Sequence, residues 1–126
     1  MALPTNDLPP EVQRLLPLTP AVFYTLLALA EADRHGYAIM QHSKLLSGGN
    51  FRMGPGTLYA TIQRLLDLAL IEEIPEPAGT ENGDTRRRYY RLSRNGKSLL
   101  ELDLDRMRSA VRFASDMKIA GGMNAS

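Results

Sequence analysis

The chain has 126 residues, of which 44% are hydrophobic, a size that fits one modest domain with an appendage. It contains no run of about 18 uncharged apolar residues and begins without a secretory leader, so we expect a soluble, cytoplasmic protein. The absence of cysteine excludes disulfides, thiol nucleophiles and thiolate metal sites, and the formal net charge of +1 argues against a general affinity for polyanions.

The chain begins with an arm, residues 1–17, that contains four prolines. Proline interrupts helices, so at most one short helix, about residues 10–16, fits here. We expect the arm to pack loosely on the domain. The first long helix then starts after Thr19, a good N-cap, with Pro20 in its first turn, and ends near Asp33.

A second helix is predicted after Gly36, closed by the glycine-rich SGGN loop. Its inward residues are expected to be Ile39, Leu45 and Leu46, and its outward residues Gln41, Ser43 and Lys44. The GPGTLYATIQ segment opens a third helix, about residues 55–68, whose apolar residues follow one helical face. That face comprises Leu58, Ile62, Leu65, Leu66 and Ala69, and the opposite face presents Thr57, Ala60, Gln63, Arg64 and Asp67, with Tyr59 to one side.

A β-hairpin is predicted next. The LIEEI segment is a short strand, a polar loop rich in turn-forming residues follows, and RRRYYRLS alternates as the returning strand. Arg88, Tyr90 and Leu92 fall on one side of that strand, with Tyr90 and Leu92 assigned to the core. The hairpin therefore has two strands and a long tip.

The last element is a long helix, residues 94–120, with Ser93 as its N-cap and a short tail, residues 121–126. Apolar residues recur in it at the 4-3-4-3 spacing of a helix that packs on another helix. The expected dimer interface comprises Leu100, Leu104, Met107, Val111, Phe113, Ala114 and Met117. Packing back onto the same chain is the alternative, but a stripe of this size left uncovered would be an exposed apolar patch.

The basic residues are clustered along the chain, although the net charge is close to zero. Ten of the fifteen basic residues lie in two segments without acids, between Asp33 and Asp67 and between Asp84 and Glu101. The order of three helices and a hairpin over residues 18–93 indicates a mainly helical, winged helix-turn-helix domain. In that architecture the third helix enters the major groove, and the second helix and the wing contact the backbone. Some winged domains bind proteins instead.

Three segments together resemble the PadR-type transcriptional regulators. These are LTPAVFYTLLALAEADRHGYAIMQ, GPGTLYATIQRLLDLALIEE and RRRYYRLSRNGKSLLE, and the resemblance as a whole covers roughly residues 18–118. The resemblance implies a homodimeric repressor that binds an inverted repeat in promoter DNA and is often released by a small effector. It also implies a short type of member, with a single C-terminal helix.

The sequence departs from the family pattern at several positions. Gly54 stands where a capping residue such as Ser is frequent, and Ala60 where Pro is frequent. No tryptophan is present, so members that stack flat ligands between interface tryptophans are poor guides to any effector here. An effector pocket would use Phe23, Met107 and Phe113, which could equally close a solid core.

Candidate DNA contacts follow from these elements. In the third helix, Thr57 and Tyr59 lie in the first turn, where free amides attract anions, and Gln63 and Arg64 can pair with adenine and guanine. Tyr59 packing sideways and solvation of Gln63 and Arg64 are the alternatives. The full set of candidates is Ser43, Lys44, Gly56, Thr57, Tyr59, Ala60, Gln63, Arg64, Arg86, Arg87 and Arg88.

The three wing arginines cannot all point the same way on a strand. One or two should meet DNA, while the third pairs with an acid such as Glu72 or Glu73. Tyr37, in the His-Gly-Tyr turn, is interpreted as structural.

The sequence shows no recognisable catalytic, metal-binding or nucleotide-binding motif. His35 and His42 lack a metal-binding pattern, and GPGTLY lacks the remaining residues of a nucleotide-binding loop. We therefore expect no enzyme, metal or cofactor, but a DNA-binding repressor acting as a homodimer, with or without a small-molecule effector. The alternative is a winged-helix interaction or small-molecule-binding module without DNA readout.

Overall fold

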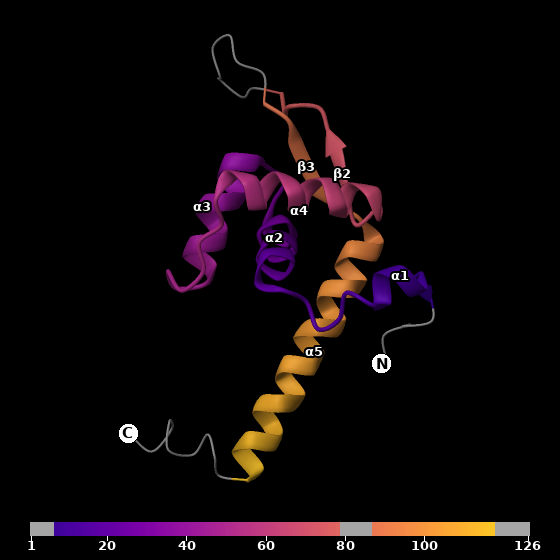
Figure 1. Cartoon of the computed structure of the whole chain (residues 1–126), viewed down its shortest axis with the longest axis vertical. Helices are drawn as coiled ribbons and strands as arrows, with labels where there is room; N and C mark the ends of the chain where they lie inside the picture. Colours follow the sequence, from indigo (N-terminus) through magenta and orange to yellow (C-terminus); the bar gives the residue numbers. More distant parts are fainter. Residues whose placement is uncertain (1–6, 79–86, 118–126) are drawn as a thin grey trace.

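The computed structural model describes residues 7–78 and 87–117. Its elements follow in the order α1 (Pro10–Gln13), α2 (Pro20–Glu31), β1 (Arg34–His35), α3 (Gly36–Leu46), α4 (Pro55–Asp67), β2 (Ile71–Ile74), β3 (Tyr89–Leu92) and α5 (Arg94–Asp116). Figure 1 shows α2, α3 and α4 gathered into one body with the hairpin above it, while α5 runs from the base of the hairpin past the body. The predicted class, mainly helical with a small hairpin, is confirmed.

The predicted helix starts are confirmed at α2 and α5. Thr19 Oγ1 accepts a hydrogen bond from the Val22 N–H at 3.4 Å, and Pro20 is the first residue of α2. Ser93 Oγ accepts from the Gly96 N–H at 3.1 Å. These side chains satisfy amides that a helix leaves without a partner at its start.

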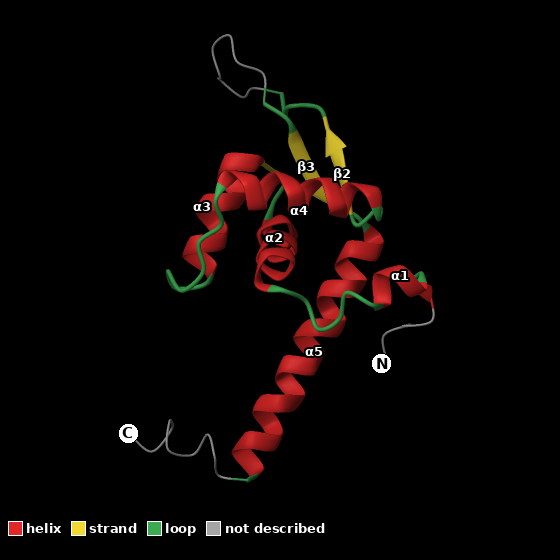
Figure 2. Ribbon diagram, in the orientation of Figure 1, coloured by secondary structure: helices red, strands yellow, loops and turns green. Residues whose placement is uncertain are grey.

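The sheet has three antiparallel strands rather than two, in the order β1-β3-β2. Figure 2 shows β2 beside β3. The hairpin pairs Ile71 with Leu92, and β1 pairs Arg34 with Tyr90 on the other edge of β3. The prediction of a two-stranded hairpin missed β1 because two residues are too few to show an alternating pattern.

The core lies where α2, α4, the sheet and the first turns of α5 meet. Its fully buried side chains include Leu26, Leu58, Leu65 and Leu99. The described part of the arm, from residue 7 onward, belongs to this core, because Leu8 and Val12 are only 3% and 1% exposed. The expectation of a loosely packed arm is therefore wrong.

The inward face of α3 differs from the prediction. Ile39 is buried as expected, but Leu45 is 72% exposed and Leu46 is 38% exposed. Ser43, four residues after Ile39, is buried instead, because positions four apart share a helical face. The helix ends at Leu46, and the predicted glycine stop follows it as Gly48 and Gly49, whose φ angles of 64° and 84° suit glycine.

The end of α4 also differs. Ala69 does not continue the apolar face but takes a φ of 57° in the turn after the helix. The Leu70 N–H donates to the Leu65 carbonyl at 2.9 Å, which closes α4, and the chain enters β2 directly. This turn receives the start of α5, since the Ser93 N–H donates to the Leu70 carbonyl at 3.1 Å.

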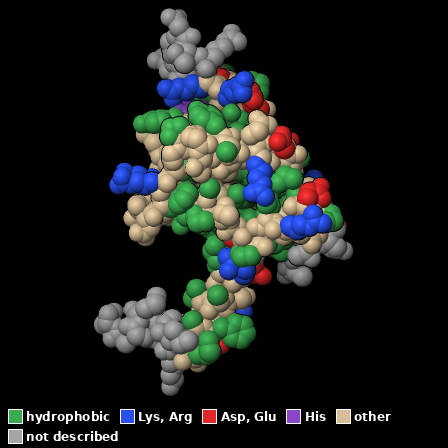
Figure 3. Space-filling model, viewed as in Figure 1, with side chains coloured by type: hydrophobic (Ala, Val, Ile, Leu, Met, Phe, Trp, Pro, Cys, Tyr) green, Lys and Arg blue, Asp and Glu red, His purple; other side chains and the backbone are tan. Residues whose placement is uncertain are grey.

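The long helix α5 has a docked half and a protruding half. Leu99 and Leu100 are buried in the core, whereas Val111, Phe113 and Met117 are 63%, 67% and 61% exposed. Figure 3 shows hydrophobic side chains on the end of α5 that extends below the body. The helix ends at Asp116, before the predicted stop, and the predicted tail lies outside the described residues. Within residues 7–78 and 87–117, no helix combines the length and apolar character needed to cross a bilayer.

Candidate nucleic-acid interface

The outward face of α4 is open along its whole length. Its candidate contact residues are all exposed: Gly56, Thr57, Tyr59, Ala60, Gln63 and Arg64. The N-cap, Gly54, makes no side-chain cap hydrogen bond, and the first turn contains no acid. Because first-turn amides lack partners within a helix, this end of α4 can receive an anion.

Steric constraints within the protein do not explain why glycine stands at two positions at the start of α4. Gly54 has an ordinary φ of −77°, and a Cβ built on Gly54 or Gly56 meets no heavy atom of the described residues within 4 Å. By contrast, a Cβ on Gly96 would lie 2.1 Å from the Leu70 carbonyl oxygen. Gly54 and Gly56 therefore do not serve packing within the protein. They leave space free on the outer side of the helix start, where another molecule can approach the backbone.

Two candidates on α4 differ in their freedom. The Gln63 side-chain amide donates to Asp67 Oδ1 at 2.9 Å, an exposed pair four residues apart. This bond holds Gln63 along the helix axis, so a base contact must compete with Asp67. Arg64 is exposed beside it.

The two candidate DNA contacts on α3 differ in their exposure to solvent. Ser43 is fully buried, and its Oγ has no hydrogen-bond partner among the described residues. Its assignment as a phosphate ligand is therefore wrong. Lys44 is exposed, but it lies in the last turn, roughly 13 Å along the helix from His35, which caps the other end.

The two described wing arginines contact different side chains, as expected for neighbouring residues of an extended segment. Arg87 Nη1 lies 2.8 Å from His35 Nε2, and Arg88 Nε lies 3.9 Å from a Glu73 carboxylate oxygen. The expected pairing of one arginine with Glu73 is thus present. Arg86 lies outside the described residues. Tyr90 is buried as predicted, and Leu92 packs at the edge of the core.

A pocket of about 370 Å³ joins three of these elements. It is lined by His35, Gly36, Tyr37, Tyr59, Arg87, Arg88 and Tyr90. Tyr37, interpreted from the sequence as structural, is 57% exposed and lines this pocket. A Cβ built on Gly36 would approach the Tyr59 ring to 3.6 Å, so α3 and α4 meet closely at the floor.

Ionisation in this pocket is shaped by burial and by the arginines. Burial lowers the pKa of His35, and the Arg87 guanidinium lowers it further, while Glu76 acts in the opposite direction. Burial raises the pKa of Tyr90, with a contribution from Glu73, although Arg88 opposes it. The imidazole of His35 is therefore held neutral beside a permanent cation.

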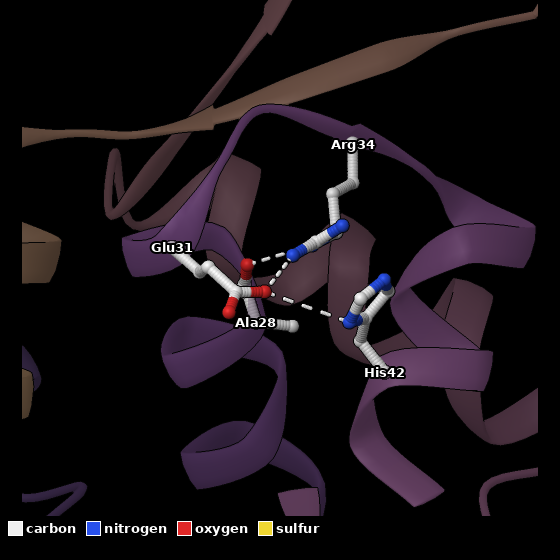
Figure 4. Close-up of polar contacts among 4 residues, drawn as sticks. All are labelled: Ala28, Glu31, Arg34 and His42. Atoms are coloured by element: carbon white, nitrogen blue, oxygen red, sulfur yellow. Dashed lines mark hydrogen bonds and ion pairs between the residues drawn. The ribbon is translucent and has the colours of Figure 1, made fainter. Parts of the chain in front are cut away.

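A second polar cluster fixes the start of α3. Figure 4 shows Arg34 and His42 pointing toward Glu31 at the end of α2. Arg34 donates to the Ala28 carbonyl at 2.9 Å and pairs with Glu31, while His42 Nδ1 lies 3.6 Å from the same carboxylate. Arg34 thus satisfies a carbonyl in the last turn of α2 and holds β1, and with it His35, in place.

A sequence profile of the transcriptional regulator PadR-like family matches residues 25–102, more than half of the chain. The chain belongs to the PadR-like family. The family is one of transcriptional regulators, which accords with the open face of α4 and the basic wing beside it.

Two curated relatives of this PadR-like chain have no described function. An uncharacterized protein X of Lysinibacillus sphaericus is 35% identical over 75 residues, which cover 60% of this chain and 66% of the relative. An uncharacterized 37.1 kDa protein in transposon Tn4556 of Streptomyces fradiae is 34% identical over 87 residues, or 69% and 23% of the two chains. The chain spans less than two thirds of either relative.

Solved structures show the same fold. A PadR family transcription regulator from Clostridium difficile superposes with a TM-score of 0.64 at 23% identity, over 79% of this chain and 98% of the other. A transcriptional regulator from Clostridium thermocellum gives 0.62 at 20% identity, over 86% and 96%. At these identities the likeness concerns the fold, and it confirms the winged-helix architecture of this PadR-like chain.

Two pocket residues were missed as functional candidates. His35 and Tyr37 were visible as the His-Gly-Tyr turn, but their meeting with the wing depends on β1, which the sequence did not reveal. The two-residue pairing of β1 with β3 brings positions 35 and 87 together across 52 residues.

Proposed function

We propose that this PadR-like protein is a sequence-specific DNA-binding repressor that acts as a homodimer on an inverted repeat in promoter DNA. One observation carries the proposal: α4 starts with an acid-free first turn, no side-chain cap and two unobstructed glycines, and Tyr59 of the same helix lines a pocket with Arg87 and Arg88. A helix in this state offers amides and positive potential to phosphates and presents Thr57 and Arg64 to base edges.

Selection of duplexes from a random library, followed by anisotropy titration of the selected site, tests DNA binding. We expect the logarithm of the affinity to fall by about 0.9 for each phosphate contact per tenfold rise in salt. Arg87→Ala should weaken all duplexes about equally, whereas Gln63→Ala should relax the preference at one base step per half-site. Failure to enrich any duplex at low salt would instead favour the winged-helix module without DNA readout.

The homodimer rests on the protruding half of α5. Leu104, Met107 and Val111 line an apolar groove of about 430 Å³ with Arg108 and Arg112. The predicted interface needs one correction, because Leu100 is buried in its own chain and cannot reach a partner. The remaining predicted interface residues are Leu104, Met107, Val111, Phe113, Ala114 and Met117.

The double substitution Val111→Glu with Phe113→Glu should weaken self-association by at least about 100-fold, since each fully buried apolar side chain contributes about 1.5–3 kcal/mol. Sedimentation equilibrium measures this change. The circular dichroism spectrum should stay the same, because both side chains are exposed in the monomer. Asp105→Lys on the polar side of α5 is the control and should leave the dimer intact. A monomeric wild type at micromolar concentration would remove the homodimer.

Release by a small effector is part of the proposal inherited from the family resemblance. Of the residues expected to line an effector pocket, Phe23 is buried in the core and Phe113 is exposed on the protruding half of α5. An effector site that uses Phe113 therefore depends on what a second protomer places against α5.

A further inference from the structure

The pocket beneath the wing is lined by hydrogen-bond donors and cations. Tyr37, Tyr59 and Tyr90 contribute hydroxyl groups, and Arg87 and Arg88 contribute guanidinium groups. No acidic side chain is among its described lining residues. A guanidinium group has no acceptor. Arg88 pairs with Glu73 and hydrogen-bonds Tyr90, whereas the partner that lies 2.8 Å from Arg87 is a ring nitrogen of His35.

His35 has a conflict that points to such an acceptor. The Ala38 N–H donates to His35 Nδ1 at 3.1 Å, which caps α3 and places the imidazole proton on Nε2. Nε2 lies 2.8 Å from Arg87 Nη1, which is also a donor. In the other neutral tautomer Nδ1 carries the proton, so it faces the Ala38 N–H as a second donor. In the doubly protonated ring both nitrogens face another donor. No protonation state of His35 makes both contacts favourable hydrogen bonds.

The helix behind the pocket adds to the preference for an anion. α3 has eleven residues, its first turn contains no acid, and Gly36 and Tyr37 are its first two residues. Its positive end therefore faces the same cavity as the two arginines. The acids nearby are Glu73 and Glu76, which line the adjoining cavity on the other side of the arginines. The pair between Arg88 and Glu73 is long and exposed, so it competes weakly with a ligand.

We propose that this pocket binds one oxyanion, a phosphate group of the operator backbone, held between Arg87, Nε2–H of His35 and the hydroxyls of Tyr37 and Tyr59. An oxygen placed there accepts from both Arg87 and His35 and removes the conflict between two donors. The assignment of the phosphate to DNA rests on the proposed function, whereas the pocket itself does not. This phosphate contact, to which α4 itself contributes only Tyr59, would fix the register of α4 in the major groove.

The first test uses inorganic phosphate on the full chain. The protein has two histidines, so their ring-proton resonances can be followed separately by NMR. Phosphate should shift the His35 resonance and raise the pKa of His35, because an anion favours the protonated ring. The His42 resonance should not respond, since His42 lies against Glu31 outside the pocket. Arg87→Ala should weaken the phosphate dependence about tenfold, through loss of a charged hydrogen bond.

The second test locates the phosphate on DNA. Each backbone phosphate of a selected duplex is replaced in turn by an uncharged methylphosphonate. One position per half-site should lower the affinity of the wild type about tenfold and leave that of Arg87→Ala unchanged, since the contact is already lost in the variant. Arg91→Ala is the matched control, because Arg91 lies on β3, directly after the segment that holds Arg87, but pairs with Asp33 outside the pocket. It should keep the wild-type pattern.

The outcomes separate the pocket from the proposed function. A His35 response to phosphate together with one coupled backbone position supports the proposal in full. A His35 response without any coupled position keeps the oxyanion pocket but overturns its assignment to DNA, leaving a free anion as the ligand. Tight duplex binding with an unmoved His35 resonance and no coupled position overturns the pocket and leaves the DNA-binding regulator standing. A His35 response in a protein that binds no duplex overturns the regulator and, with it, the assignment of the phosphate to DNA, but keeps the oxyanion pocket.

Discussion

Replacing Gly96 by alanine should lower the free energy of unfolding by about 3 kcal/mol, the upper range for an over-packed site. A Cβ at this position would lie 2.1 Å from the Leu70 carbonyl oxygen and 2.8 Å from Leu92 Cδ1. The Leu70 carbonyl cannot simply move, since it accepts the Ser93 N–H, and Ser93 Oγ donates to the neighbouring Ala69 carbonyl at 2.7 Å. The methyl group therefore forces the start of α5 away from the turn that holds it.

Thermal and urea denaturation followed by circular dichroism measure this loss, which corresponds to roughly 10 °C or more in Tm for a domain of this size. Gly56→Ala is the matched control, because Gly56 also lies in the first turn of a long helix but faces open space. It should raise stability by up to about 1 kcal/mol. Equal midpoints for Gly96→Ala and the wild type would show that the contact at Leu70 is not rigid.

Replacing Gly56 by glutamate should reduce DNA affinity about 100-fold or more while the fold gains stability. An acid in the first turn of a helix is favoured by about 0.3–1 kcal/mol, and α4 has none there. A carboxylate at this position would meet a DNA phosphate as a like charge, a juxtaposition that costs several kcal/mol. Stability and binding therefore move in opposite directions.

The uncharged variant Gly56→Gln separates charge from size. It adds nearly the same volume without the carboxylate, so the part of the loss that it reproduces comes from blocked approach of the backbone. Anisotropy titration of the same duplex compares the three proteins. An unchanged affinity for Gly56→Glu would place DNA elsewhere than at the start of α4.

Local signals were sufficient to predict most of the fold. The N-caps Thr19 and Ser93, the glycine pair after α3 and the apolar period of α4 each act within a few residues, so they can be recognised before the tertiary structure is known. The prediction of which α3 side chains are buried failed because burial there depends on tertiary contacts. Whether Ser43 or Leu45 turns inward depends on which face α2 and α4 cover, and the short apolar pattern of α3 did not specify it.

The candidate site could be predicted only in part. The open face of α4 was expected, because its polar residues repeat with the helical period. The pocket beneath the wing could not be expected from any one segment, since it needs His35, Tyr59 and Arg87 to meet through the pairing of β1 with β3. Leu100 shows the same dependence: its spacing suits an interface between chains, but the docking of α5 on the turn at Leu70 buries it in its own chain.

The anchored start of α5 makes this helix a lever. Its 23 residues span roughly 34 Å, and its first turn is fixed to the body by Ser93 and Gly96. In a dimer joined at the far end of α5, a change of 10° between the two helices would move the two recognition helices by roughly 6 Å relative to each other, nearly the rise of two base pairs. A small ligand wedged between the protruding halves could thus put both α4 helices out of phase with the groove without touching either of them.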